Sequence, residues 1–148
     1  MIKKRIMQIR DLEINDYHLK YCELIQHAFQ KNFKYIQYLD FKNFVNELNK
    51  NHVIKVIEEN DEIVASGTLI IEPKIIHQFG KVGHIEDIFV NPEYQGQGLG
   101  EEIVTHLIDL SKEYGCYKCI LNCDVNLIKF YQKCGLEPKN MQMVKYIK

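Results

Sequence analysis

Residues 83–100, which read GHIEDIFVNPEYQGQGLG, constrain the fold of this chain more than any other stretch. Alternating apolar residues over 84–90 predict a strand, and an Asn-Pro pair marks its end. A glycine-rich turn follows over 95–100, and a helical pattern then runs to Tyr114. A strand, a glycine-rich turn and a helix in this order offer free backbone N–H groups to an anion such as a phosphate.

Composition limits the class of protein. The chain has 148 residues, 46% of them hydrophobic and 26% charged, which suits one globular domain spanning residues 1–148. Its formal net charge of −1 argues against a nucleic-acid-binding protein. No apolar stretch approaches the ~20 residues of a membrane span, and the N-terminus lacks the apolar segment of ~7–15 residues found in signal peptides. We therefore expect a cytoplasmic protein with no nucleic-acid partner and no membrane span.

The five cysteines are an odd number in a chain without a secretory signal, which favours free thiols in a reducing compartment. Cys116, Cys119 and Cys123 superficially resemble metal-ligand spacing, but a second cysteine pair or a histidine pair at zinc spacing is missing. Cys119 and Cys123 fall at even spacing in a predicted strand. We expect small buried cysteines and no metal site.

The region before the glycine turn predicts two helices and a β-hairpin in addition to a first strand. The expected elements are a strand over 4–10, a helix capped by Asn15 or Asp16, a second helix over 38–49, and hairpin strands over 52–59 and 62–71. A loop over 72–81 then connects the hairpin to the strand that precedes the glycine turn.

After the glycine turn, Gly115 is expected to end the long helix in the left-handed conformation. The remaining elements are a strand over 118–123, a short helix over 126–134 that Gly135 stops, and a final strand over 141–147. The strand–helix–strand passage from 83 to 123 predicts one parallel pair with a right-handed crossover. The fold class is therefore α+β, or mixed α/β, with a twisted, mostly antiparallel sheet and helices on both of its faces.

Gly96, Gly98 and Gly100 carry no Cβ and allow positive φ, so successive N–H groups can point at one anion. The helix that follows adds its own free N–H groups. The alternative is a turn that needs glycine only for its own geometry. A P-loop is excluded because two glutamates follow Gly100 in place of a lysine and a hydroxyl residue, and the GxGxG spacing does not match the dinucleotide fingerprint GxGxxG.

The pattern Gln95-x-x-Gly98-x-Gly100 resembles the acetyl-CoA signature [RQ]-x-x-G-x-[GA] of the GNAT superfamily of N-acetyltransferases. Within that superfamily, GHIEDIFVNPEYQGQGLG, YGCYKCILNCD and KFYQKCG resemble the glucosamine-6-phosphate N-acetyltransferase family of the UDP-N-acetylglucosamine pathway. The resemblance is specific over about residues 70–135 and weak at both ends of the chain. It implies a GNAT-like fold, acetyl-CoA as co-substrate, glucosamine 6-phosphate as acceptor and no metal.

The resemblance also implies a cofactor site. Backbone N–H groups of the turn are expected to bind the diphosphate, and the exposed edge of the preceding strand is expected to pair with the pantetheine amides, where a β-bulge commonly frees that edge. The residues implied are Glu86, Asp87, Ile88, Phe89, Val90, Tyr94, Gln95, Gly96, Gln97, Gly98, Leu99, Gly100 and Tyr131.

Three catalytic roles follow from the resemblance. A backbone N–H near Asp87 is expected to stabilise the charge that develops on the carbonyl oxygen. Tyr131 in KFYQKCG matches the tyrosine that assists the leaving thiolate; its alternative is a core aromatic beside Phe130. Asn122 stands where relatives carry an acidic residue whose main-chain carbonyl orients the amine. If the acidic side chain does that work instead, water or Asp124 must accept the proton.

The sugar phosphate needs cations for its phosphate and carboxylates for its hydroxyl groups. The expected substrate-binding residues are Lys74, Ile75, Ile76, His77, Glu86, Asp87, Tyr117, Lys118, Asn122 and Lys145. Lys145 replaces an arginine that the resemblance leads us to expect, and each lysine taken alone is typical of a solvated surface group. His84 and Glu86 share a strand face, either as an acid–base pair or with His84 as a hydrogen-bonded structural histidine.

Two alternative functions stay open at this point. The GNAT motif alone also fits an enzyme that acetylates another amine, such as a polyamine, a protein N-terminus or an antibiotic. A non-catalytic acyl-CoA-binding sensor is the second alternative, and the presence of Tyr131, Gly98 and Gly100 argues against it. The resemblance further implies a homodimer whose active sites draw residues from both chains.

Overall fold

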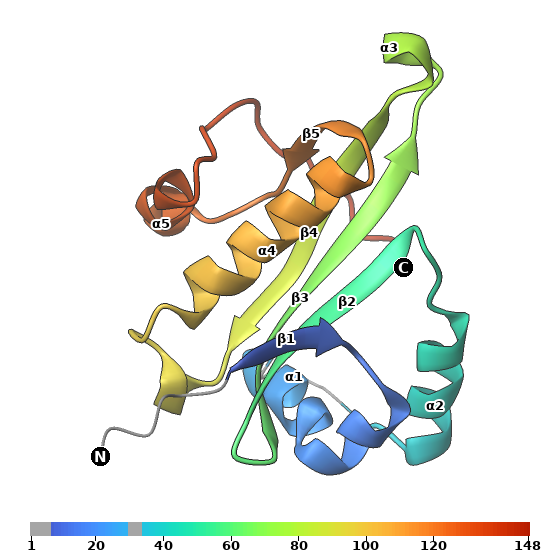
Figure 1. Ribbon diagram of the computed structural model, residues 1–148, viewed down its shortest axis with the longest axis vertical. Helices are drawn as coiled ribbons and strands as arrows, with labels where there is room; N and C mark the ends of the chain where they lie inside the picture. Colours follow the sequence, from blue (N-terminus) through green and yellow to red (C-terminus); the bar gives the residue numbers. More distant parts are fainter. Residues whose placement is uncertain (1–6, 30–33) are drawn as a thin grey trace.

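One five-stranded sheet organises the structure, a computed structural model that describes residues 7–29 and 34–148 (Figure 1). Its strands are β1 Gln8–Asp11, β2 His52–Glu59, β3 Glu62–Pro73, β4 Lys81–Val90 and β5 Cys116–Ile120, and they lie in that order across the sheet. Each neighbouring pair is antiparallel except β4 and β5, which run parallel. The predicted sheet, mostly antiparallel with one parallel pair, is confirmed.

Helices cover both faces of this sheet, as predicted, and Figure 1 shows α4 lying along one of them. The helical elements are η1 Ile14–Leu19, α1 Tyr21–Phe29, α2 Tyr38–Glu47, α3 Ile76–Phe79, η2 Pro92–Tyr94, α4 Leu99–Glu113, η3 Val125–Leu127 and α5 Ile128–Lys133. No helix in the described parts of the chain has both the length and the apolar character needed to cross a membrane.

Alternation along the strands separates two apolar layers. On β2, Val56 belongs to the same buried cluster as Phe41 of α2, whereas the next residue, Ile57, is buried with Ile103 of α4. Successive side chains of a strand point to opposite faces, so one strand supplies both layers. Full burial of such an aliphatic side chain stabilises the fold by about 1.5–3 kcal/mol.

The long helix α4 begins and ends where its sequence predicts. Gly98 precedes it with a φ of 86°, and Gly115 follows it with a φ of 76°, both in the left-handed region that favours glycine. Ile103, Val104 and Leu107 recur at helical spacing and are fully buried against the sheet.

The N-terminal helical region begins differently from the prediction. The N-cap residue is Glu13, and Asp16 Oδ2 accepts the Glu13 backbone N–H at 2.7 Å. Asp16 is itself buried, and the guanidinium of Arg10 compensates its charge. A left-handed Lys20, with a φ of 64°, then separates η1 from α1, so the expected single helix is broken in two. Part of the predicted first strand lies outside the described residues, and β1 is seen from Gln8.

The predicted loop over 72–81 is shorter than expected because both flanking strands extend into it. β3 continues to Pro73 and β4 begins at Lys81. Between them, the turn α3 holds His77, Gln78 and Phe79 at φ values of 53°, 56° and 59°. Positive φ is uncommon outside glycine, so this turn is a strained backbone feature.

The last part of the chain departs most from the prediction. β5 starts and ends earlier than the predicted strand 118–123, and Cys123 lies beyond it and is exposed. The expectation of buried cysteines is therefore wrong for Cys123, although Cys22 is buried. Residues 141–147 form no strand, because no strand edge of the described chain pairs with them.

Candidate active site

A β-bulge interrupts β4 near its carboxyl end. The pairing with β3 shifts between Ser66 and Thr68, so two β4 residues, Asp87 and Ile88, lie opposite Gly67 alone. Asp87 has a φ of 50°, in the left-handed region. A bulge leaves its extra residue unpaired and bends the strand. The bend in β4 thus lies at the residues for which sequence analysis predicted contact with the reacting thioester.

The bulge also inverts the direction of the side chains along β4. Before it, Ile85 packs against Leu107 of α4. Beyond it, Ile88 and Val90 pack on the α4 face, whereas Phe89 packs with the cluster beneath α1 and α2. Odd-numbered residues therefore face α4 before the bulge and even-numbered residues face it afterwards. Asp87 stands exposed where the two registers meet.

β4 and β5 diverge just before the bulge. Their parallel pairing begins at Lys81 and ends where His84 pairs with Ile120, the last residue of β5. Among the described residues, no strand pairs with the rest of β4 on that side. An open strand edge presents unpaired N–H and C=O groups. An extended ligand that contains amides can pair with such an edge as an added strand would.

The glycine turn lies directly after this open edge. A Cβ placed on Gly96 or Gly98 would meet no atom within 4 Å, and Gly98 caps α4 without a side-chain hydrogen bond. The N–H groups of Tyr94 and Gln95 are used within the turn, where they donate to backbone oxygens at 2.8 and 3.3 Å. The open part of the turn therefore starts at Gly96. Its geometry and the first turn of α4 suit an anion.

Two predicted cofactor residues use their side chains to hold the turn itself. Gln95 Nε2 donates to the Val90 carbonyl oxygen at 3.2 Å, and Gln97 Nε2 donates to the Glu93 carbonyl oxygen at 3.4 Å. Leu99 is fully buried under the turn. The side chains thus brace the turn, and any role of this segment in anion binding falls to its backbone.

The helix α5 packs against the start of α4. A Cβ placed on Gly100 would lie 3.1 Å from Cζ of Phe130, so the glycine permits a close approach of the ring. The rings of Phe130 and Tyr131 meet edge to face with centroids 4.9 Å apart. Tyr131 is half-buried in the same cluster as Val90 and Leu99. The fold therefore brings together the end of β4, the glycine turn and Tyr131.

Burial determines the electrostatic state of Tyr131. Desolvation raises the pKa of its phenol above the usual value, with smaller contributions in the same direction from Cys123 and Cys134. A phenol with a raised pKa is fully protonated at neutral pH and can donate a proton or a hydrogen bond.

The sequence matches the model of the Acetyltransferase (GNAT) family over residues 17–136. The chain belongs to the GNAT acetyltransferase family. GNAT enzymes transfer the acetyl group of acetyl-CoA, so the chain is an acyltransferase. The bulge, the open edge of β4 and the glycine turn are the parts of the fold in which sequence analysis expected the co-substrate to bind.

Individual relatives are similar over nearly the whole chain. A glucosamine 6-phosphate N-acetyltransferase of Arabidopsis thaliana is 38% identical over 151 residues, which cover 94% of this chain and 95% of the relative. One from Dictyostelium discoideum is 36% identical over 143 residues, covering 95% and 91%. The crystal structure of the Arabidopsis thaliana enzyme superposes with a TM-score of 0.90, covering 96% of this chain and 99% of that one.

The structure places Lys74 and His84, both considered in the sequence analysis, in a small charged cluster around Glu72. Lys74 Nζ donates to Glu72 Oε1 at 2.5 Å, and His84 Nε2 lies 2.7 Å from Glu72 Oε2. The hydrogen bond from Lys74, followed by that of His84, lowers the pKa of the Glu72 carboxyl. The partner of His84 is therefore Glu72, and the suggested pairing of His84 with Glu86 is replaced.

The predicted substrate residues of the hairpin form a second group at its tip. The His77 ring lies on Tyr117 of β5 with centroids 4.1 Å apart, and Lys118 Nζ is 5.7 Å from the centre of the same Tyr117 ring. Ile75 and Ile76 have exposed fractions of 84% and 61%, so nothing in the described chain covers them.

The remaining predicted residues are exposed and lie after β5. Asn122 and Asp124 follow the end of that strand, on the segment that leads to α5. Lys145 lies in the C-terminal segment, which pairs with no strand among the residues that the structure describes. Within the described residues, no cluster of His, Cys, Asp and Glu has the size of a metal site.

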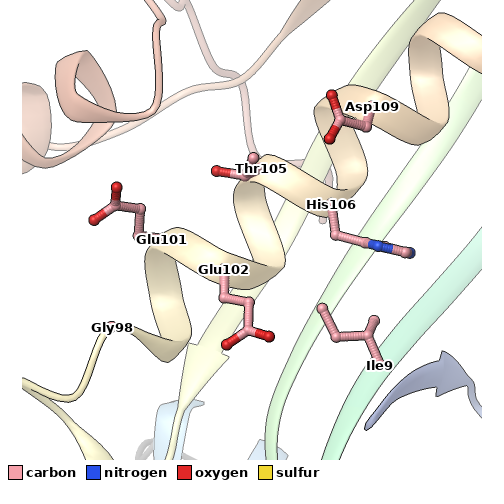
Figure 2. Close-up of a pocket in the computed structure, with 7 residues that line it drawn as sticks. All are labelled: Ile9, Gly98, Glu101, Glu102, Thr105, His106 and Asp109. Carbon is pink, nitrogen blue, oxygen red and sulfur yellow. The ribbon is translucent and has the colours of Figure 1, made fainter. Parts of the chain in front are cut away.

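A separate cavity of about 490 Å³ lies between α4 and β1 (Figure 2). It is lined by Ile9, Gly98, Glu101, Glu102, Thr105, His106 and Asp109. Three carboxylates make it unfavourable for a diphosphate. His106 Nε2 is buried without a hydrogen-bond partner among the described residues, and burial, followed by the charge of Lys55, lowers the pKa of His106.

Sequence reasoning missed Glu72 and Gly67. Glu72 is brought to His84 by the antiparallel pairing of β3 with β4, and a correct register would have placed the two on one face. Gly67 lies beneath α4, where a Cβ would come within 2.7 Å of Ile88 and 2.9 Å of Leu107. A glycine inside a predicted strand is the available sequence signal for such a bulge.

Proposed function

We propose that this chain transfers the acetyl group of acetyl-CoA to the amine of glucosamine 6-phosphate, which gives N-acetylglucosamine 6-phosphate for UDP-N-acetylglucosamine synthesis. The observation that carries this proposal is that the chain aligns with glucosamine 6-phosphate N-acetyltransferases over nearly their whole length, at 36–38% identity. The geometry around Tyr131 supports it. We place the reaction in one acetyltransferase domain, residues 1–148, of a cytoplasmic protein.

The co-substrate is proposed to lie along the open edge of β4. Its pantetheine amides pair with the backbone of Ile88 and Val90, and its diphosphate accepts hydrogen bonds from the N–H groups of residues 96–100. The positive φ of Gly96 and Gly98 and the free start of α4 support this placement. Because Glu101 and Glu102 flank the turn, we assign the anion to the backbone and not to side chains.

The chemistry is proposed to be direct attack of the amine on the thioester. The amine nitrogen bonds to the carbonyl carbon, the oxygen gains negative charge, and the carbon–sulfur bond then breaks. A backbone N–H at the bulge, near Asp87, stabilises the oxygen, a role worth up to ~3–4 kcal/mol in other enzymes. Tyr131 donates a proton or hydrogen bond to the departing thiolate. Its half-buried, protonated phenol supports this role.

The acceptor is proposed to bind on the face of β4 opposite α4. Glu86 and Asp87 would accept hydrogen bonds from the sugar hydroxyl groups, and the main-chain carbonyl of Asn122 would orient the amine. Lys118 and Lys145 are the proposed cations for the sugar phosphate, together with His77. Lys74 is less available for the phosphate because Glu72 already neutralises it.

We further propose that the enzyme is a homodimer with shared active sites. The C-terminal segment exposes 92% of Met141, 94% of Met143, 87% of Tyr146 and 85% of Ile147. An apolar segment that extends from the fold without a partner is typical of an interaction site. A second copy that covers it would also carry Lys145 toward a neighbouring site.

A thiol-release assay tests the proposed reaction. The purified chain, acetyl-CoA and glucosamine 6-phosphate should release coenzyme A, and unphosphorylated glucosamine should serve far less well because it lacks the charged group that the lysines bind. Mass spectrometry of the sugar product should show one added acetyl group. Absence of release with either sugar, while a polyamine or another amine is acetylated, would assign the site to a different GNAT acceptor.

A further inference from the structure

The structure places an imidazole at the point where β4 and β5 separate. His84 forms the last pair of the two strands, with Ile120 of β5. Its antiparallel partner on β3 is Ile70, and Ile70 is 37% exposed. The neighbouring residues Leu69 and Ile85 face α4. His84 therefore points to the opposite face of the sheet, the same face as Glu86, on which the acceptor is proposed to bind.

The carboxylate of Glu72 determines which nitrogen of His84 carries its proton. Glu72 Oε2 lies 2.7 Å from His84 Nε2, and its other oxygen accepts from Lys74 at 2.5 Å. Lys74 keeps the carboxyl ionised, because its hydrogen bond lowers the pKa of Glu72. An ionised carboxylate only accepts hydrogen bonds, so Nε2 is the donor. Nδ1 of the neutral ring then keeps a lone pair that can accept a proton.

The acetyl transfer needs such an acceptor. An amine enters mostly as an ammonium ion and must lose a proton before its nitrogen can attack. The position expected to hold an acidic residue is Asn122, which cannot accept a proton. Histidine is the side chain whose charge ordinarily changes between about pH 5 and 8, and a carboxylate on its far nitrogen stabilises the charged ring. The Glu72–His84 pair thus has the chemistry that Asn122 lacks.

We propose that His84 Nδ1 accepts the proton of the acceptor amine and that Glu72 is its positioning residue. The proton moves from the ammonium nitrogen to Nδ1, and the free amine forms its bond to the acetyl carbon as the carbon–sulfur bond breaks. The thiolate takes a proton from Tyr131. The acetylated nitrogen still carries one proton more than an amide, and it returns that proton to the Tyr131 oxygen, while the imidazolium proton goes to solvent. This proposal rests on the proposed acetyl transfer to glucosamine 6-phosphate.

The charged and titratable groups around His84 come from several strands of the same face. They are His52 on β2, Glu72 at the end of β3, Lys74 after it, Glu86 on β4, and Lys118 on β5, whose partner in β4 is Val82. Of these, Glu72 is the group in hydrogen-bond contact with the ring. His52 of β2 provides a matched control, because it is a histidine on the same face of the sheet and pairs with Ile70 from the side away from β4.

The test compares His84→Gln with His52→Gln across pH 6 to 9.5, using acetyl-CoA and glucosamine 6-phosphate. We expect His84→Gln to lower kcat roughly 100-fold near pH 6.5, a typical contribution of acid–base catalysis, with KM for acetyl-CoA unchanged. The loss should shrink at high pH, where the amine is already neutral. His52→Gln should keep the wild-type profile. Glu72→Gln should reduce kcat with the same pH trend, and Glu72→Asp should restore part of it.

A uniform loss at every pH, or no loss, would overturn the role of His84 while leaving the proposed function intact. If the wild-type enzyme releases no thiol with glucosamine 6-phosphate, both the role of His84 and the proposed function are wrong. A second measurement does not depend on turnover. Long-range ¹H–¹⁵N spectra, with the His84 signal assigned by its absence in His84→Gln, should show the ring protonated on Nε2 in the wild type. A ring protonated on Nδ1 would contradict the proposal.

Discussion

The ring of Phe130 lies against Gly100, at a distance where a Cβ on residue 100 would be 3.1 Å from Cζ. This contact joins the first turn of α4, which belongs to the proposed diphosphate site, to α5, which carries Tyr131. The position of the phenol is thus coupled to the glycine turn through one ring. The third glycine of the GxGxG string, Gly100, leaves room for Phe130 of α5, whereas Gly96 and Gly98 face open space.

Gly100→Ala should therefore displace α5 and reduce turnover. A Cβ contact of 3.1 Å requires the ring to shift by a few tenths of an ångström. We expect kcat to fall by roughly tenfold, less than the ~100-fold that a 1 Å misplacement can cost. Steady-state kinetics should show a nearly unchanged KM for acetyl-CoA. In a Phe130→Leu background the same substitution should cost less, and an equal cost in both backgrounds would refute the contact.

Tyr131→Phe should lower kcat by about 100-fold while acetyl-CoA binding stays within about twofold. The phenylalanine keeps the packing against Phe130 and removes only the hydroxyl group. Because burial raises the pKa of Tyr131, wild-type turnover should lose activity through ionisation of this phenol only at a higher pH than an ordinary tyrosine, whose pKa is about 10, would cause. Stopped-time thiol release and calorimetric titration measure the two quantities. Tyr114→Phe, at the other end of α4, provides the control and should behave as wild type.

Gly67→Ala should destabilise the protein and disturb the bulge. The added Cβ would lie 2.7 Å from Ile88 Cδ1 and 2.9 Å from Leu107 Cδ1, both inside the core. Overpacking of this kind costs about 1–3 kcal/mol, which urea unfolding resolves. Adding Ile88→Val removes the nearer methyl group and should recover part of the loss. If the single variant unfolds at the wild-type urea concentration, the bulge does not depend on Gly67.

Stability should fall at alkaline pH through Tyr21 of α1. Burial raises the pKa of Tyr21 to about 12, opposed by a hydrogen bond with Ser66. The folded state therefore keeps the phenol proton after the unfolded chain, with a pKa near 10, has lost it. The contribution is present below pH 10 and lost as pH rises toward 12. We expect Tyr21→Phe to remove about 1 kcal/mol of the stability loss that urea unfolding measures between pH 8 and 10.5. The control variant Tyr114→Phe, at the far end of α4, should remove none of it.

The C-terminal segment should control the oligomeric state. Wild-type protein should sediment at twice the 17.5 kDa of one chain. A double variant with Met143→Asp and Ile147→Asp places two charges on the apolar segment. It should dissociate to monomers and lose most of its activity with glucosamine 6-phosphate. Substituting Asp for the exposed Ile75 tests whether the hairpin tip belongs to the same interface. A fully active wild-type monomer at micromolar concentration would exclude shared sites.

The fold could be predicted from the sequence because the signals for its helices and strands are local. The boundaries of β2 and of α4 followed from alternation and from the flanking glycines, to within a residue. It failed where a long-range contact decides the conformation. Asp16 became the buried partner of Arg10, with its carboxylate accepting the Glu13 N–H, and the end of β5 depends on where β4 turns away. The C-terminal segment has no partner strand within the described part of the chain, and its predicted strand is absent there.

The candidate site divides in the same way. Tyr131 and the glycine turn were recognisable because each lies in a contiguous motif, and the fold placed them side by side. The Glu72–His84 pair was not recognisable, because it depends on the register between two strands. The acceptor could not be read from either motif, and the thiol-release assay with glucosamine 6-phosphate tests it.

The sequence by itself determined that residues 83–100 form a strand, a glycine turn and the start of a helix, since dihedral preferences and apolar spacing act between neighbours. Tertiary structure alone decided the bulge opposite Gly67, the separation of β4 from β5 at His84, and the contact of Phe130 with Gly100. These features arise where segments distant in the chain compete for one space. Packing among them, and not local preference, sets their geometry.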